Sequence, residues 1–310
     1  MRLASVLLLA VLAGPAVGQR AGGPFTVVET GRSFARLADA VDSVGDGSAT
    51  IRIASGVHRD CAVQERGRVA FVAAEPGRAV FERTACEDKA ALVLRGRGAR
   101  VEGLVFRDLE VADGNGAGIR LEKGNLEVAN CMFLDSQSGI LTAADPASRV
   151  AVDRSTFSGL GKDPTGNGAH GIYVGGYGSL RVANSRFERG RGGHYLKSRA
   201  PRIEVLDSSF DDTGGRSTNY AIDLSNGASG RIAGNEFVVG PHKDNYSTVV
   251  TVAPEGARNG SDGLVVEGNG VRLAPGADFR TTFVGTWTGE AVTVRGNRLG
   301  PGVAERARRW

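Results

Sequence analysis

Residues 182–187 read Val-Ala-Asn-Ser-Arg-Phe, and this short pattern decides the fold. One apolar residue is followed five positions later by another, with a small side chain between them. The pattern occurs eight times, at residues 101–106, 128–133, 152–157, 182–187, 205–210, 232–237, 266–271 and 294–299. Successive segments start 23 to 34 residues apart. Such a period is typical of a solenoid, whose units bury their apolar faces only by stacking on their neighbours.

A second short strand recurs between these segments, at residues 118–121, 139–142, 171–174, 195–198, 221–224 and 249–252. Each coil is therefore predicted to hold at least two strands. Within the six-residue segments, after the first, one position is small and usually polar: Cys131, Ser155, Ser185, Ser208, Asn235, Asn269 and Asn297. We expect these side chains to form a hydrogen-bonded ladder from coil to coil.

The N-terminal part predicts a cover for the open end of the solenoid. Ser33 is expected to cap a helix over residues 33–44 that Gly45 ends. Its apolar face would consist of Phe34, Leu37, Val41 and Val44. The strand at residues 51–58 then begins the first coil. A covering element is expected because an uncovered end exposes apolar core and an unpaired strand edge.

Residues 33–60 resemble the entry of pectin-lyase-like right-handed β-helix proteins, in which a capping helix leads into an I-x-I-x-x-G-x-x strand. The fold class expected is therefore all-β, a right-handed parallel β-helix of about 9–10 coils with an N-terminal capping helix. The resemblance implies activity on polysaccharides, because members are mostly lyases, hydrolases and epimerases. Others are non-catalytic adhesins and phage tailspikes.

The first residues predict export. A basic start, an apolar run at residues 3–12 and small residues before position 18 are typical of a signal peptide over residues 1–18. Residues 19–310 then form one domain, periplasmic or extracellular, and no stretch reaches the roughly 20 apolar residues of a membrane span. The formal net charge of +4 permits an anionic partner. No motif indicates a nucleic-acid partner.

The three cysteines match neither a disulfide scaffold nor a zinc site. Cys61 and Cys86 could pair in an oxidising compartment or stay free. Cys131 falls in a strand pattern and is interpreted as a small buried residue.

Candidate functional residues gather on the second strand of each coil. Aligned on its inward residues, this strand predicts an outward column of Arg120, Leu141, Tyr173, Lys197, Asp223 and Thr251. Neighbouring coils are about 4.8 Å apart, so Tyr173, Lys197 and Asp223 are expected side by side. Arg199 would lie above Ser225, giving a cationic patch on three consecutive coils.

Aromatic and polar side chains join this patch at the strand entrance. His170, His194 and Tyr220 occupy equivalent places there, and they include two of the chain's four histidines. The substrate-binding residues expected are Asp223, Tyr220, Tyr195, Ser225 and Asn226. The loops at residues 159–169 and 240–247 would wall a groove along this face.

The patch also has a plain structural interpretation. Lys197 and Asp223 could be an ordinary cross-strand ion pair, which contributes little when exposed. His170 and His194 could be hydrogen-bonded residues at a strand edge. Arg120 and Glu122 are interpreted as surface residues, and residues 211–212 as a solvated turn.

The favoured function is a lyase that cleaves an acidic, uronate-containing polysaccharide by β-elimination. That reaction needs a positive group for the carboxylate, a base for the C5 proton and an acid for the leaving oxygen. Arg199 is expected to neutralise the substrate carboxylate, Lys197 or His194 to act as the base, and Tyr173 to act as the acid. His170 is expected beside them as a further catalytic residue. Asp223 would orient Lys197 or bind a cation such as Ca²⁺.

Other functions stay open. A uronate epimerase would use the same groups, whereas hydrolysis normally needs two carboxylates, and only Asp223 is expected here. A non-catalytic glycan-binding or cell-surface protein is the alternative from another class. Residues 193–199 with 220–224 resemble an uncharacterised bacterial β-helix group. Unlike known lyases of this fold, they have Lys197 and Arg199 on one strand and no acidic calcium cluster.

Overall fold

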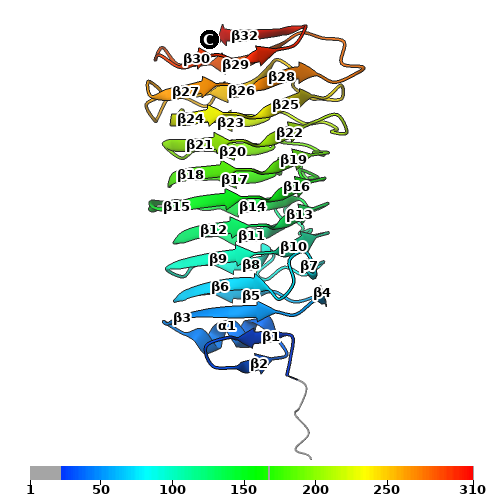
Figure 1. Ribbon diagram of the computed structural model, residues 1–310, viewed down its shortest axis with the longest axis vertical. Coiled ribbons are helices and arrows are strands. Elements are labelled where there is room, and N and C mark those ends of the chain that lie inside the picture. The colour runs from blue at the N-terminus through cyan, green and yellow to red at the C-terminus, as the bar shows by residue number, and fades with distance from the viewer. Residues whose placement is uncertain (1–21, 167, 310) are drawn as a thin grey trace, which may run out of the picture.

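The computed structural model describes residues 22–166 and 168–309, so the predicted signal peptide over residues 1–18 lies outside the described residues. The described chain winds into a stack of coils, each contributing one strand to each of three parallel sheets (Figure 1). The predicted all-β parallel β-helix is confirmed, and each sheet holds ten such strands. Each coil thus has three strands, because the recurring six-residue segment turns a corner and belongs to two of them.

Sheet A contains the first strand of each coil. Its parallel strands are β3 (Ser48–Ile53), β6 (Arg68–Ala73), β9 (Gly98–Glu102), β12 (Asn125–Ala129), β15 (Asp145–Asp153), β18 (Tyr177–Ala183), β21 (Arg202–Leu206), β24 (Ser229–Ala233), β27 (Leu264–Glu267) and β30 (Thr293–Arg295). Two antiparallel strands, β1 (Phe25–Val27) and β2 (Arg32–Phe34), extend this sheet at its N-terminal edge.

Sheet B contains the second strand of each coil. Its strands are β4 (Gly56–His58), β7 (Ala79–Glu82), β10 (Leu104–Arg107), β13 (Met132–Leu134), β16 (Thr156–Ser158), β19 (Arg186–Glu188), β22 (Ser209–Asp211), β25 (Glu236–Val239), β28 (Gly270–Leu273) and β31 (Arg298–Leu299). Its inward side carries a stack of phenylalanine rings whose centroids are 4.6 to 5.8 Å apart, at Phe81, Phe106, Phe133, Phe157, Phe187, Phe210 and Phe237. These fully buried rings form the centre of the core.

Sheet C contains the third strand of each coil, which is the second recurring strand of the sequence. Its strands are β5 (Ala62–Gln64), β8 (Ala90–Leu94), β11 (Ala117–Leu121), β14 (Ser138–Thr142), β17 (Ile172–Val174), β20 (Leu196–Ser198), β23 (Ile222–Leu224), β26 (Thr248–Val252), β29 (Thr281–Thr286) and β32 (Val303–Arg308). This sheet carries the candidate site.

The predicted polar ladder is confirmed at the corner between sheets A and B. The backbone N–H of each member donates to the side chain of the next coil's member, from Ser155 to Ser185 at 3.2 Å and from Ser208 to Asn235 at 2.9 Å. The residue before each member has left-handed backbone, such as Asn184 at φ 50° and Gly234 at φ 69°. This sharp corner turns the following side chain inward, where it meets the coil above.

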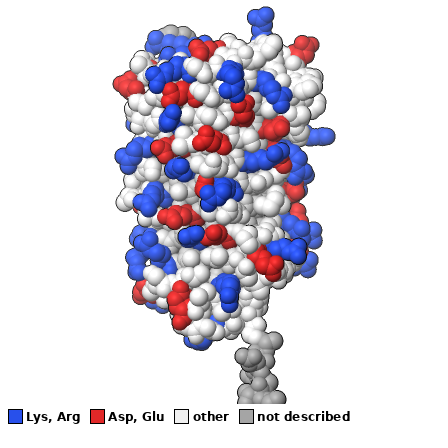
Figure 2. All heavy atoms as spheres, viewed as in Figure 1, with Lys and Arg blue, Asp and Glu red and all other residues white. Residues whose placement is uncertain are grey.

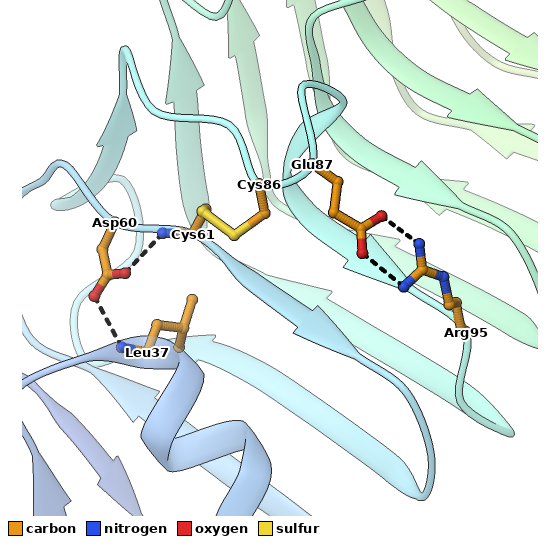
Figure 3. Close-up of a disulfide and its surroundings, with 6 residues drawn as sticks. All are labelled: Leu37, Asp60, Cys61, Cys86, Glu87 and Arg95. Carbon is orange, nitrogen blue, oxygen red and sulfur yellow. Dashed lines mark hydrogen bonds and ion pairs between the residues drawn. A yellow bond between two sulfur atoms is a disulfide. The ribbon is translucent and has the colours of Figure 1, made fainter.

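The N-terminal end is covered by helix α1 (Leu37–Val44) together with β1 and β2 (Figure 1). Leu37, Ala40 and Val41 are buried, and Gly45 ends the helix with a φ of 57°. The helix start predicted at Ser33 is wrong, because Ser33 and Phe34 belong to strand β2. The cap instead comes from the first coil, where Asp60 Oδ2 accepts the Leu37 N–H at 2.8 Å (Figure 3).

A disulfide fixes the same region. Cys61 and Cys86, whose pairing the sequence left open, are bonded between the first two coils (Figure 3). The other oxygen of Asp60 accepts the Cys61 N–H at 2.8 Å, so the helix start and the disulfide are connected through one side chain. Cys131 is buried and unpaired, as predicted.

Replacing a single ladder hydroxyl tests the role of the ladder. Ser208→Ala removes the acceptor of the Ser185 N–H, a 3.1 Å bond, and leaves that donor buried. We expect the free energy of unfolding to fall by about 1–3 kcal/mol. Ser209→Ala is the matched control, because Ser209 faces outward on β22 and should change stability by less than about 0.5 kcal/mol. Equal thermal midpoints for both variants would contradict the ladder's contribution.

Candidate functional site

The outward column predicted from the sequence lies on sheet C. From coil to coil, the strand register places side by side, in order, Arg120, Leu141, Tyr173, Lys197, Asp223 and Thr251. Neighbouring members are separated by one strand spacing, about 4.8 Å. The placement of the column is therefore confirmed, and what its members do stays a prediction.

Two cations and two carboxylates form the centre of the site, and we call Lys197, Arg199, Asp223 and Glu255 the charge cluster. Lys197 Nζ lies 3.4 Å from Asp223 Oδ2 and 2.6 Å from Glu255 Oε1. Arg199 Nη1 lies 2.6 Å from the other oxygen of Glu255, Oε2. Glu255 thus bridges the two cations with one oxygen each.

The predicted cationic patch is consequently corrected, because the formal charges of the four residues cancel. Glu255 was missed by the sequence analysis, since it lies in the turn after β26 and outside the aligned strand. The sequence signal that could have identified Glu255 is its position three residues after β26, the strand that carries Thr251 of the column. On the side of the molecule drawn in Figure 2, acidic and basic side chains are interspersed, so no broad field of one sign covers that side.

Asp223 is the buried member of the charge cluster, and hydroxyl groups hold it in place. The residue is only 2% exposed, and its two oxygens accept hydrogen bonds from Ser225 Oγ at 3.0 Å and Thr251 Oγ1 at 3.1 Å. Ser225 is itself fully buried, so its predicted contact with substrate is corrected to a support of Asp223. A buried carboxylate with this many donors is rigidly placed next to Lys197.

Arg199 is oriented by three partners. Its Nε donates to Tyr173 Oη at 2.9 Å, and its Nη1 donates to Asn226 Oδ1 at 3.1 Å as well as pairing with Glu255. Asn226 is buried, so it positions the guanidinium from below. Because Arg199 is a donor to Tyr173, the phenolic hydrogen of Tyr173 stays available to another acceptor.

Two histidines and a tyrosine stack along the edge of the cluster. The ring centroids of His170 and His194 are 5.1 Å apart, and those of His194 and Tyr220 are 5.3 Å apart. The equivalent places predicted for these three side chains are thus confirmed. His170 Nδ1 accepts the backbone N–H of His194 at 3.1 Å, and His194 Nδ1 accepts that of Tyr220 at 3.2 Å.

These bonds assign the tautomer of both rings. An accepting Nδ1 leaves the hydrogen of a neutral imidazole on Nε2, and His194 Nε2 lies 3.4 Å from Asp223 Oδ2. Burial, together with the charges of His194 and Lys197, lowers the pKa of His170 to about 3. Burial, together with Lys197 and Lys243, lowers the pKa of His194 to about 3 as well. Both rings are therefore neutral hydrogen-bond donors at Nε2.

A depression of about 400 Å³ runs along the column from Lys197 and Arg199 of the charge cluster to Arg120. Strands of sheet C contribute part of its lining: Arg120, Ser138, Leu141, Thr142, Tyr173 and Lys197. The other lining residues are Asn115, Gly168, His170 and Arg199, which directly follows β20. The loop at residues 159–169 borders it through Gly168, as expected for a wall of the groove. Arg120, interpreted from the sequence as a surface residue, is thus part of the depression.

Tyr195 is placed differently from the prediction. It is only 5% exposed and packs edge-on against Phe187 and Phe210 inside the coil. Its hydroxyl donates to Asp212 Oδ1 at 2.6 Å, and Lys243 Nζ lies 3.0 Å from Asp212 Oδ2. Tyr195 is therefore corrected from the outer face to the interior, and Asp212 from a solvated turn to a buried ion pair.

The residues around Asp223 do not fit the cation expected from the sequence. Its oxygens are occupied by two hydroxyl donors and lie next to Lys197, whereas Ca²⁺ needs six to eight oxygen ligands. Among the residues that the structure describes, no group of three or more His, Cys, Asp and Glu side chains is arranged to hold a metal ion.

A comparison with known protein families identifies the repeated coils of this chain. Residues 90–298 match the family model described as a right-handed beta helix region. The chain belongs to the right-handed β-helix family. No curated protein matches this sequence. Within residues 22–166 and 168–309, no helix is long and apolar enough to cross a bilayer.

Solved structures similar to this right-handed β-helix have low sequence identity. The Streptococcus pneumoniae surface protein and adhesin PfbA is 9% identical with a TM-score of 0.42, over 87% of this chain and 94% of that one. ORF18 of Geobacillus virus E2 is 11% identical with a TM-score of 0.42, over 87% and 56%. A pectin methylesterase mutant in complex with a hexasaccharide is 12% identical with a TM-score of 0.32, over 84% and 68%. The chemistry of this chain has to be argued from its own site.

The lowered histidine pKa values predict a loss of stability in mild acid. Between pH 6.5 and 5 the unfolded chain protonates its histidines, while His170 and His194 stay neutral until the pH approaches about 3. The free energy of unfolding should therefore fall as the pH falls, by up to about 1.4 kcal/mol per pH unit for each histidine. This window lies above the titration of Glu255, whose unperturbed pKa is 4.5.

His194→Gln isolates the contribution of one ring. We expect it to flatten the dependence of the urea unfolding free energy on pH between 6.5 and 5, relative to the unsubstituted chain. His242→Gln, at an exposed histidine, is the control that should leave the slope unchanged. An unchanged slope in His194→Gln would show that this ring is protonated in the folded protein.

Proposed function

We propose that this protein is an exported polysaccharide lyase that cleaves uronate-containing chains by β-elimination at the charge cluster. The observation that carries the proposal is the bridge of Glu255 between Lys197 and Arg199. One carboxylate is bound there by an ammonium and a guanidinium, which is the environment that a uronate carboxylate needs. Glu255 extends from a turn and its side chain is 40% exposed, so a substrate carboxylate can take its place.

The exchange would place the substrate between the groups that the reaction requires. Arg199, oriented by Asn226 and Tyr173, would hold the carboxylate and stabilise the charge that develops when the C5 proton leaves. Lys197 in its neutral form would take that proton at Nζ. His194 is the weaker alternative as base, because its Nδ1 accepts the Tyr220 N–H and its Nε2 carries the ring hydrogen.

The bond changes balance without a further reactant. The electrons of the C5–H bond form a C4=C5 double bond, and the C4–O bond to the neighbouring sugar breaks. The leaving oxygen takes the phenolic hydrogen of Tyr173, whose oxygen already accepts from Arg199. Asp223 lies next to Lys197 Nζ, fixes its position and stabilises the ammonium that forms when Nζ takes the proton. His170 and Tyr220 continue the stacked edge along which the sugar would lie.

Hydrolysis is less well supported, although Glu255 supplies the second carboxylate that the sequence analysis missed. Burial alone would raise the pKa of Glu255, but hydrogen bonds from Lys197 and Arg199 lower it to about 2. Glu255 is therefore ionised and cannot donate a proton to a leaving group. An epimerase would use the same residues and return the proton to the opposite face of C5. A non-catalytic glycan-binding protein has less support, because Tyr195 lies in the core.

Export is supported by the disulfide between Cys61 and Cys86. Such bonds persist mainly in oxidising compartments outside the cytoplasm. The predicted acidic polysaccharide and the predicted signal peptide agree with this location.

Incubation with a panel of uronate polysaccharides tests the proposal. We expect ultraviolet absorbance from unsaturated chain ends, and a loss of about 10²–10⁴-fold in rate for Lys197→Ala and for Tyr173→Phe. Arg199→Ala should reduce the rate as well. Arg181→Ala is the matched control, because Arg181 is an exposed cation on sheet A. Absence of unsaturated ends with every polymer would refute the lyase. Full activity in Lys197→Ala would refute the assignment of the site to the charge cluster. Altered uronate stereochemistry by NMR in an intact polymer would identify the epimerase instead.

A further inference from the structure

Arg120 is a partly buried cation at the far end of the depression from the charge cluster. It lies outward on β11, and its side chain is 26% exposed. Among the described residues its Nε has no hydrogen-bond acceptor, and its nearest carboxylate oxygen, Glu122 Oε1, is 3.6 Å away. That carboxylate is already bound by Arg95 at 2.6 Å and Lys89 at 3.0 Å. The guanidinium of Arg120 is therefore only weakly compensated.

The depression connects Arg120 to the proposed carboxylate site. Arg120, Tyr173 and Lys197 lie on strands of sheet C, Arg199 directly follows β20, and all four line the depression. Between them the floor carries Leu141, which can contact the apolar face of a sugar ring. Asn115, which is half-buried, adds an amide group for sugar hydroxyls.

The strand register sets the spacing between the two ends. Arg120 and Lys197 are three coil steps apart, through Leu141 and Tyr173, which corresponds to about 14 Å at the strand spacing. One coil step is close to the length of one pyranose residue in an extended chain. A chain lying along the depression would therefore advance about three sugar residues between the cluster and Arg120.

We propose that Arg120 forms a second carboxylate subsite that binds a uronate about three residues away from the one held by Arg199. This inference rests on the proposed function and specifies its substrate class. A homopolymer of uronates presents a carboxylate at that residue. A polymer in which uronates alternate with neutral or amino sugars presents an uncharged or basic residue there instead. The depression thus selects homopolymeric uronate chains.

Calorimetric titration with uronate homo-oligomers tests the subsite. A Tyr173→Phe background keeps the oligomers from being consumed while the cations remain in place. Oligomers of five and six residues should bind more tightly than those of two and three. Arg120→Gln should lower the affinity for the longer oligomers about tenfold, because one charge-assisted hydrogen-bonded contact is lost. The affinity for the shorter oligomers should not change. Alternating oligomers of the same length should be insensitive to this substitution.

Arg100→Gln is the matched control, because Arg100 faces outward on the same coil but on sheet A, and all binding should be unchanged. The subsite is refuted if Arg120→Gln leaves the affinity for long homo-oligomers unchanged, or lowers the affinity for all lengths equally. The lyase proposal stands in either case. If no oligomer binds to the background chain or to the unsubstituted chain, both proposals fail. Far-ultraviolet circular dichroism and the thermal midpoint establish that each variant is folded.

Discussion

Backbone pairing between successive coils is the interaction on which the rest of the structure depends. A single coil leaves its strands without hydrogen-bond partners, so each coil is stable only where another lies on it in register. The same stacking produces the buried phenylalanine column and the polar ladder through Ser208 and Asn235. Fixed register also places outward residues from distant segments one strand spacing apart. The site is therefore a consequence of the way the core is assembled.

The fixed register of the coils explains how opposite charges can be concentrated on sheet C. Asp223 is buried, and each of its oxygens accepts a hydrogen bond from a hydroxyl group, of Ser225 or of Thr251, in addition to the ion pair with Lys197. Buried charges without such partners would destabilise the fold strongly. Glu255 differs because it comes from a turn, its side chain is 40% exposed, and it pairs with the two cations. A fixed carboxylate below and an exchangeable one above is an arrangement suited to binding an anionic group reversibly.

The repeat and its alternation were sufficient to predict the fold, the ladder and the outward column from Arg120 to Thr251. Each of these depends on strand periodicity, which is visible in the sequence. Contacts made by strand ends, loops and turns were not predictable in this way. Tyr195 points into the core just before β20 begins, where its hydroxyl donates to Asp212. Asp212 pairs with Lys243 from a loop, and Glu255 pairs with Lys197 from a turn. The helix start was misplaced because its cap comes from Asp60 rather than from a neighbouring residue.

The proposed reaction requires that a uronate carboxylate replaces Glu255 between Lys197 and Arg199. A crystal structure of the Tyr173→Phe variant with a bound uronate oligomer tests it most directly. We expect the sugar carboxylate within hydrogen-bonding distance of the Arg199 guanidinium, with Glu255 turned away from both cations. An oligomer bound on another face, or bound beside an unbroken bridge from Glu255 to Lys197 and Arg199, would contradict it.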